Sequence, residues 1–247
     1  MATDRVDAPA KLTLSLRVTG VRDDGYHLID AEMVTLALAD ELTIDADEDG
    51  LSADGPFAEG IPLDGTNLVA RALLLAGRRA RVHVQKRIPH GGGLGGGSAD
   101  AAAVLRWAGS TDLLAASRLG ADIPFCIAGG RARVRGIGEL IDPLPFEPLD
   151  VTLVVPPFGV STPAVYRGWD ELQREGATRW SGVNDLEPAA LRVEPRMAQW
   201  RTWIEELAPT PTLAGSGSTW FVRGHHPAAQ ALGQRGATVV LTTTRPR

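Results

Sequence analysis

The sequence is poor in the residues that build disulfides, metal sites and nucleic-acid surfaces. Its one cysteine, Cys126, excludes an intramolecular disulfide and is typical of a reducing compartment. The five histidines are scattered, and the adjacent pair His225 and His226 has no metal-ligand spacing. The formal net charge is -5 and no basic run is interleaved with aromatic residues, so we expect no nucleic-acid partner.

Long apolar segments are also absent. Residues 1–7 contain no apolar signal core, and no apolar run reaches the roughly 18 residues of a membrane span. We therefore expect a cytoplasmic protein without a membrane partner. With 247 residues, 44% hydrophobic and 22% charged, the chain can form one large domain or two smaller ones.

Glycine, in contrast, is concentrated at one place. Residues 91–97 read Gly-Gly-Gly-Leu-Gly-Gly-Gly. Glycine adds nothing to core packing and loses the most entropy on folding, so we interpret the run as a close approach of backbone N–H groups to an anion. The residues that follow predict a helix with Ser98 as its N-cap. Such a loop before a helix is a typical phosphate site.

Two better-known glycine loops differ from this run. A Walker loop needs a lysine where Gly97 stands. The dinucleotide fingerprint is formally met within residues 91–96, and Asp112 lies near the position of its acidic ribose ligand. However, the preceding strand, residues 80–86, alternates like a half-exposed antiparallel strand, and Pro89 separates it from the glycines. A dinucleotide site and a flexible linker remain as weaker alternatives.

Periodicity predicts a mixture of helices and antiparallel strands, which favours an α+β fold in two layers. Residues 11–18 alternate without a break, so Lys11 and Thr13 share a face opposite the leucines. The other expected strands cover 33–36, 42–44, 80–86, 132–134, 151–155, 220–222 and 238–242, and the other expected helices cover 67–76, 112–119, 163–174 and 188–207. The proline-rich residues 143–148 are the candidate joint between domains at 1–147 and 148–247.

Two charged residues are candidates for chemistry. Asp122 lies just past a predicted helix, where an acid can be a general base or a turn-former that caps its own backbone. Lys11 lies on the polar face of a strand, where a lysine is usually a solvated surface charge. As a pair, they would supply a proton acceptor and a cation that stabilises it, which phosphoryl transfer needs beside a phosphate cradle and Mg²⁺.

Several segments resemble a known family. Three are similar to the signature motifs of the GHMP kinase superfamily, which includes galactose, homoserine and mevalonate kinases: residues 9–12, 89–98 and 213–217. Four more resemble the branch that acts on a cytidine-diphosphate-linked methylerythritol: residues 22–27, 119–125, 157–162 and 184–187. The resemblance spans nearly the whole chain in the right order.

The resemblance implies a two-domain α+β kinase with its active site in the cleft between the domains. It implies phosphorylation of the 2-hydroxyl of that small molecule by ATP and Mg²⁺, in the non-mevalonate route to isoprenoids. The oligomeric state, monomer or homodimer, is left open. Asp122 would be the base and Lys11 its charged partner. The ligands of Mg²⁺ are not determined.

The same resemblance assigns the binding residues. Asn67 and Lys86 would lie by the adenosine, and the ATP phosphates would be wrapped by Pro89, His90, Gly91, Gly92, Gly93, Leu94, Gly95, Gly96, Gly97, Ser98 and Ala99. Tyr26 and Tyr166 would stack on the two faces of the cytosine, with His27 at its hydrogen-bonding edge. The remaining substrate contacts would be Thr13, Thr162, Gly215 and Ser216.

Two positions depart from the family pattern. Thr13 stands where members usually have Asn, and Ala99 replaces a usual second serine. These changes leave open a degenerate member that binds nucleotide without catalysis. A kinase for another small alcohol is a further alternative, which Tyr26, His27 and Tyr166 disfavour because a cytosine pocket would have no use there.

Overall fold

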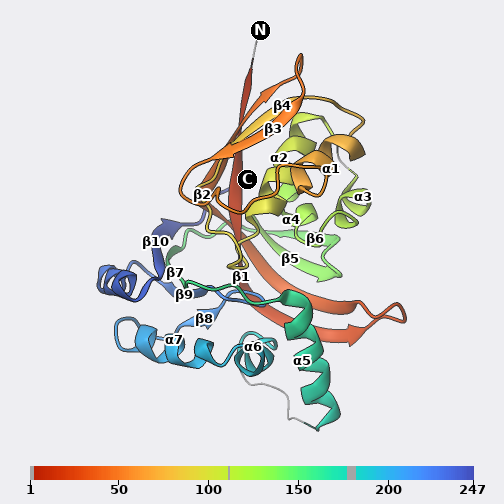
Figure 1. Cartoon of the computed structure of the whole chain (residues 1–247). Helices are drawn as coiled ribbons and strands as arrows, with labels where there is room; N and C mark the ends of the chain where they lie inside the picture. The colour runs from red at the N-terminus through yellow and green to blue at the C-terminus, as the bar shows by residue number, and fades with distance from the viewer. Residues whose placement is uncertain (1–2, 111, 177–181) are drawn as a thin grey trace.

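The computed structural model describes residues 3–110, 112–176 and 182–247, and they form two sheets with helices packed against them (Figure 1). The larger sheet has the strand order β3-β4-β2-β5-β6, with β1 paired to β2. Its strands are β1 (Asp4–Val21), β2 (His27–Asp45), β3 (Gly50–Asp54), β4 (Arg81–Gln85), β5 (Arg131–Gly136) and β6 (Leu140–Leu144). The smaller sheet has the order β10-β7-β9-β8. It consists of β7 (Asp150–Val155), β8 (Thr212–Leu213), β9 (Trp220–Arg223) and β10 (Thr238–Thr243).

The helices form two groups that follow the chain order. Figure 1 shows the first group beside the upper part of the larger sheet: α1 (Leu68–Leu75), α2 (Gly96–Trp107), α3 (Leu113–Ser117) and α4 (Ile123–Ala128). The second group lies beneath the smaller sheet: α5 (Thr162–Arg174), α6 (Glu187–Val193) and α7 (Arg196–Glu205). A 3₁₀ segment, Pro227–Arg235, precedes β10. No helix in these described ranges is long and apolar enough to cross a membrane.

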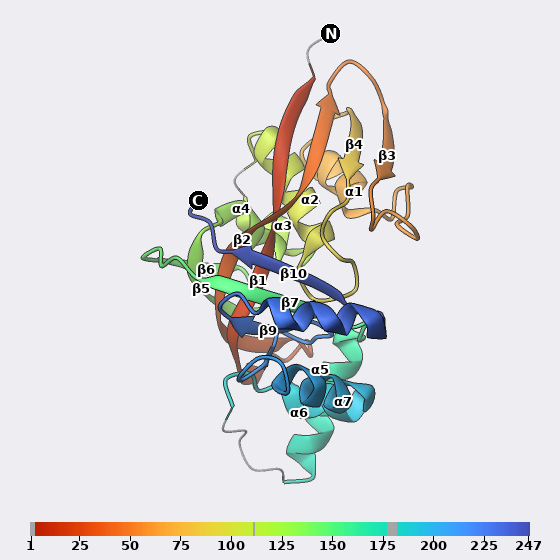
Figure 2. The ribbon, with the colours of Figure 1, turned by 90° about the vertical axis from the view of Figure 1, so that its left-hand side faces the viewer.

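The long antiparallel pair of β1 and β2 connects the two halves of the molecule. The smaller sheet runs across the middle of this pair in the rotated view (Figure 2), and Leu36 of β2 forms a bridge with Thr244 after β10. The pairing of β1 with β2 shifts register between Pro9 and Lys11 and again between Thr13 and Ser15. Such bulges re-aim side chains, and here they flank two residues of the candidate site.

One hydrophobic core is shared by segments from both ends of the chain. Leu12 of β1, the alanines of α2, and Leu153 and Phe221 of the smaller sheet belong to the same buried cluster. Ala99, Ala101, Ala102 and Ala103 of α2 are completely buried. Because alanine is small, α2 can lie close against the sheet, which brings the loop before α2 next to β1.

Most elements agree with the sequence expectations. Strand 11–18 lies within β1, helix 67–76 corresponds to α1, and helix 163–174 corresponds to α5. The α+β class is confirmed, with β4 antiparallel to β2 as predicted but parallel to β3 on its other edge. The domain boundary expected after residue 147 falls between β6 and β7, where the chain leaves the larger sheet, and the boundary itself stays a prediction.

Two expectations about helices are wrong, and one helix was not expected. Ser98 is not an N-cap, because α2 already begins at Gly96 and its cap is Gly95 in a left-handed conformation. The single helix expected over 188–207 is two helices, α6 and α7, with Pro195 as the N-cap of the second. Asp122 lies past the end of α3, as expected, but it also starts a short helix that was not expected, α4, which carries no amphipathic pattern because all its residues are apolar.

Candidate active site

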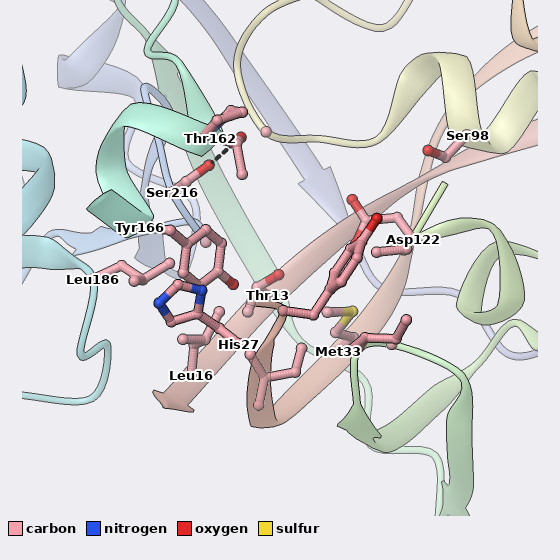
Figure 3. A pocket seen from close by; sticks show the side chains of 18 of the residues that line it. Thr13, Leu16, His27, Met33, Ser98, Asp122, Thr162, Tyr166, Leu186 and Ser216 are labelled. Atoms are coloured by element: carbon pink, nitrogen blue, oxygen red, sulfur yellow. Dashed lines mark hydrogen bonds between the residues drawn. The ribbon is translucent and has the colours of Figure 1, made fainter. Parts of the chain in front are cut away.

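A cavity of about 560 Å³ lies where β1, the glycine loop, α4, α5 and the loop after β8 meet (Figure 3). Most of the sequence-predicted residues outside the glycine loop come together there, with two members of that loop. The lining includes Lys11, Thr13, Tyr26, His27, Gly93, Ser98, Asp122, Thr162, Tyr166, Gly215 and Ser216. The structure therefore brings the candidate catalytic residues and the candidate cytosine-binding residues together around one cavity.

The two candidate catalytic residues face each other. Nζ of Lys11 lies 3.2 Å from Oδ2 of Asp122, and it also donates a 3.3 Å hydrogen bond to Oγ1 of Thr13. The lysine side chain is only 7% exposed, whereas that of Asp122 is 33% exposed. The alternative of a solvated Lys11 is therefore wrong, and Asp122 is the more exposed member of the pair.

The carboxylate of Asp122 does not cap α4. It stands at the N-cap position but accepts no side-chain capping hydrogen bond. The side-chain oxygens of a turn-forming aspartate accept hydrogen bonds from nearby backbone N–H groups. The alternative that Asp122 only caps its own backbone is therefore wrong. Asp122 instead holds its carboxylate beside the positive end of α4 and beside the ammonium of Lys11.

The glycine run is packed tightly, which corrects the expectation that these residues add nothing to packing. Gly93 has φ +79°, and a Cβ there would lie 2.9 Å from the carbonyl oxygen of Gly217. Gly95 has φ +71°, and a Cβ there would lie 2.8 Å from Cγ of Lys11. Only glycine fits these positions, and its absence of a side chain lets the two glycine loops and Lys11 meet.

The loop also presents the start of α2. Gly95, as N-cap, has no side chain with which to pair the first N–H groups of the helix. Ser98 lies in the first turn, and its position lines the cavity. Leu94 and Ala99 are buried in the core, and the N–H of Ala99 already donates to the carbonyl of Gly95. Uncapped N–H groups at a helix start suit an anion such as a phosphate.

The aromatic residues gather at another part of the cavity. The rings of His27 and Tyr166 lie 4.7 Å apart between centroids, tilted by 34°, and Figure 3 shows the two side chains against each other. Tyr26 is 59% exposed at the rim, with the guanidinium of Arg22 5.5 Å from its ring centre. Burial, assisted by the charge of Asp122, raises the pKa of Tyr166 to about 12, so its hydroxyl stays protonated.

Of the thirteen predicted ATP residues only Gly93 and Ser98 line this cavity, and the two predicted outside residues 89–99, Asn67 and Lys86, do not. Asn67 caps α1 by accepting a 2.8 Å hydrogen bond from the N–H of Val69, and its amide donates to the carbonyl of Pro62. The ammonium of Lys86 is enclosed by the carboxylates of Asp40 and Asp100. Any contact of Lys86 with adenosine would therefore use other atoms than its ammonium. Pro89 is buried and His90 exposed on the approach to the glycines.

The cluster of Lys86, Asp40 and Asp100 fastens the segment that leads into the glycine loop. Oδ1 of Asp40 accepts hydrogen bonds from the backbone N–H groups of Arg87 and Ile88, at 2.5 and 2.8 Å. One ammonium faces two carboxyl groups, and Oδ1 of Asp100 is buried with no hydrogen-bond partner. Burial raises the pKa of Asp100 to about 7. No motif or spacing in the sequence marked Asp40 or Asp100 as candidate site residues.

Two contacts hold the second glycine loop in place. The buried amide of Asn184 donates to the carbonyl groups of Leu213 and Gly215, at 2.9 and 2.7 Å. The hydroxyl groups of Thr162 and Ser216 lie 2.7 Å apart, drawn as the dashed line in Figure 3. Asn184 belongs to a segment that the sequence singled out, but its supporting role was not predicted.

The fold and the site define a GHMP kinase. Residues 67–130 match the family model described as GHMP kinases N terminal domain. The crystal structure of L. major mevalonate kinase, at 14% identity, shares the fold with a TM-score of 0.69 over 99% of this chain and 97% of that one.

The chain belongs to the 4-diphosphocytidyl-2-C-methyl-D-erythritol kinase family. The enzyme of that name from Paracoccus denitrificans is 42% identical over 88% of this chain and 85% of its own length. That from Granulibacter bethesdensis is 39% identical over 90% and 85%. A crystal structure of 4-(cytidine 5'-diphospho)-2C-methyl-D-erythritol kinase superposes with a TM-score of 0.76 at 33% identity, covering 98% of this chain and 100% of that one.

Proposed function

We propose that this protein transfers the γ-phosphoryl group of ATP to the 2-hydroxyl of 4-diphosphocytidyl-2-C-methyl-D-erythritol, in the non-mevalonate route of isoprenoid biosynthesis. The observation that carries the proposal is the pair of Lys11 and Asp122, 3.2 Å apart, in the same cavity as His27 and Tyr166. The names of the family members support the substrate. The composition supports a cytoplasmic location.

Asp122 accepts the proton of the attacking hydroxyl. It is open to the cavity and makes no capping hydrogen bond that would occupy its oxygens. Lys11 stabilises the carboxylate and the negative charge that develops on the transferred group. Thr13, which replaces the usual Asn, accepts a hydrogen bond from the ammonium of Lys11 and keeps it directed at the site. This departure therefore leaves the acid and its cation intact.

The glycine loop holds the phosphates of ATP. A Cβ at Gly93 would clash with the backbone of Gly217, and one at Gly95 would clash with the side chain of Lys11. The uncapped start of α2 offers N–H groups to an anion. Within the described residues, no group of three acidic, histidine or cysteine side chains forms a metal cage. This fits Mg²⁺, which typically binds substrate phosphates with one or two protein ligands and keeps several waters.

Ser98 at the start of α2 is an oxygen ligand that this cavity offers to Mg²⁺. When bound, the ion neutralises the charge on the phosphates. The change to Ala99 removes a hydroxyl from a completely buried position. Ser98 therefore remains the hydroxyl of the helix start that lines the site.

The aromatic part of the cavity binds the cytosine. Tyr26 at the rim and Tyr166 in the wall supply ring faces on which a base can stack. His27 supplies a ring nitrogen for its edge. A kinase for mevalonate or galactose would have no use for such a group of residues, which disfavours the second alternative from the sequence.

The test is a coupled assay of ADP release. The protein is incubated with Mg-ATP and the cytidine-linked substrate, with mevalonate and galactose as controls. We expect turnover with the cytidine-linked substrate only. Measurable ATP binding without turnover of any substrate would instead identify a degenerate member, and turnover of a control alcohol alone would identify a different kinase.

A further inference from the structure

Three side chains of α5 surround the imidazole of His27. Tyr166 packs on its face, and Trp169 stands edge-on with a centroid distance of 5.6 Å. Oδ1 of Asp170 lies 2.7 Å from Nε2. Positions 166, 169 and 170 share one helix face, which explains why a single helix can make all three contacts. The side chain of His27 is only 11% exposed, so the ring has one orientation.

The carboxylate determines which nitrogen of His27 carries the hydrogen. A carboxylate accepts hydrogen bonds and does not donate them, so the nitrogen that faces Asp170 must be an N–H. In the neutral imidazole the other nitrogen, Nδ1, then has a free lone pair. His27 therefore offers a ligand in the cavity a hydrogen-bond acceptor at Nδ1.

We propose that Asp170 is a positioning residue that fixes this form of His27 and thereby selects a pyrimidine with an amino group at C4. The proposal rests on the proposed function, which places a cytidine-linked substrate in this cavity. Asp170 itself lines the cavity beside His27 and Tyr166.

The selection follows from the two bases. Cytosine carries an amino donor at C4, and this group satisfies the acceptor on Nδ1. Uracil carries a carbonyl oxygen at that position, so two acceptors would face each other. A site built to receive a donor rejects an analogue that lacks it, because its own polar group is left unpaired. Without Asp170, the ring is free to place its hydrogen on Nδ1 and to tolerate the carbonyl.

The first experiment compares kcat/KM for the cytidine-linked substrate and its uridine-linked analogue. In Asp170→Asn, the side-chain amide can accept from Nε2–H or donate to bare Nε2, so it no longer selects one form. We expect the cytidine-to-uridine ratio to fall at least about tenfold in this variant and to be restored in Asp170→Glu. Glu171→Gln is the matched control, because it makes the same charge change on the same helix outside the cavity lining and leaves the ratio unchanged.

The second experiment needs no substrate. The ring ¹⁵N resonances of His27, assigned by their loss in His27→Gln, report which nitrogen carries the hydrogen. We expect the wild-type protein to show Nε2–H and Asp170→Asn to show a mixture. The wild-type spectrum tests the tautomer even if the Asn variant does not fold.

Two results overturn the proposal: a wild-type ring with its hydrogen on Nδ1 only, or an unchanged base ratio in a folded, active Asp170→Asn. Failure of the proposed function looks different, because the wild-type protein would then lack activity on the cytidine-linked substrate. In that case the ring spectrum still shows whether Asp170 fixes the tautomer of His27.

Discussion

The ammonium of Lys11 and the carboxylate of Asp122 lie 3.2 Å apart, and the side chain of Asp122 is 33% exposed whereas that of Lys11 is 7% exposed. Lys11 is covered because Gly95, without a side chain, allows the loop to pass over its aliphatic stem. The backbone N–H of Lys11 also donates to the carbonyl of Leu94 in that loop, at 3.0 Å. The cation is thus built into the wall, and the acid is the group that meets the substrate.

Replacing Asp122 with Asn tests whether Asp122, and not Lys11, accepts the proton. We expect kcat to fall at least about 10²-fold, because the amide cannot accept the hydroxyl proton, while ATP affinity stays nearly intact. Steady-state kinetics and calorimetric titration with ATP measure the two effects. The control is Asp112→Asn, since Asp112 caps α3 outside the cavity lining and Asn caps a helix equally well. An unchanged kcat in Asp122→Asn would remove this residue from the role of base.

The packing of the glycine run predicts unequal effects of adding a methyl group. Gly93→Ala places a Cβ 2.9 Å from the oxygen of Gly217 at a positive φ, so we expect a loss of about 1–3 kcal/mol in unfolding free energy. Gly97→Ala is the matched control. Gly97 lies within α2, and a Cβ there would meet Leu68 of α1 at an ordinary 3.6 Å. Alanine favours a helix over glycine, so this variant should be at least as stable as the wild type. Equal urea midpoints for both variants would contradict the packing argument.

The buried carboxyl group of Asp100 should make the free energy of unfolding depend on pH. Burial raises its pKa in the folded protein to about 7, from 3.8 in the unfolded chain. Between these values the folded protein holds a proton that the unfolded chain has released. The stabilisation is therefore complete below about pH 4 and is lost as pH rises towards about 7.

Asp100→Asn removes this titration. We expect the variant to gain stability relative to the wild type between about pH 4 and about pH 7, by an amount on the order of a few kcal/mol. Urea unfolding of both proteins across this range measures the difference, and other titrating groups cancel in the comparison. A difference that does not change with pH would show that Asp100 is not protonated in the fold.

Asn184 should stabilise the second glycine loop. Asn184→Ala leaves the buried carbonyl groups of Leu213 and Gly215 without their donor, at a cost of about 1–3 kcal/mol for each. Asn184→Asp is a matched variant, because it keeps the acceptor used by the N–H of Leu186 but loses both donors. We expect both variants to unfold at lower urea concentrations. An Asp variant as stable as the wild type would assign the effect to the contact with Leu186 alone.

The elements that the sequence predicted well are those whose signal is local. The alternation of residues 11–18 and the helix over 163–174 can be read from neighbouring residues alone. The start of α2 was misplaced because its cap is a left-handed glycine and not a serine side chain. Helix α4 was missed because a fully apolar segment has no period to distinguish helix from strand.

By itself, the sequence determined the kind of loop at residues 91–97, the α+β class and the family motifs, since these depend on residue types at short spacing. Only the tertiary structure decided which charged and polar groups are buried and which partners they have. Lys11 pairs with Asp122, Lys86 with Asp40 and Asp100, and His27 with Asp170. Burial and pairing arise where distant segments pack together, and no local pattern encodes that contact.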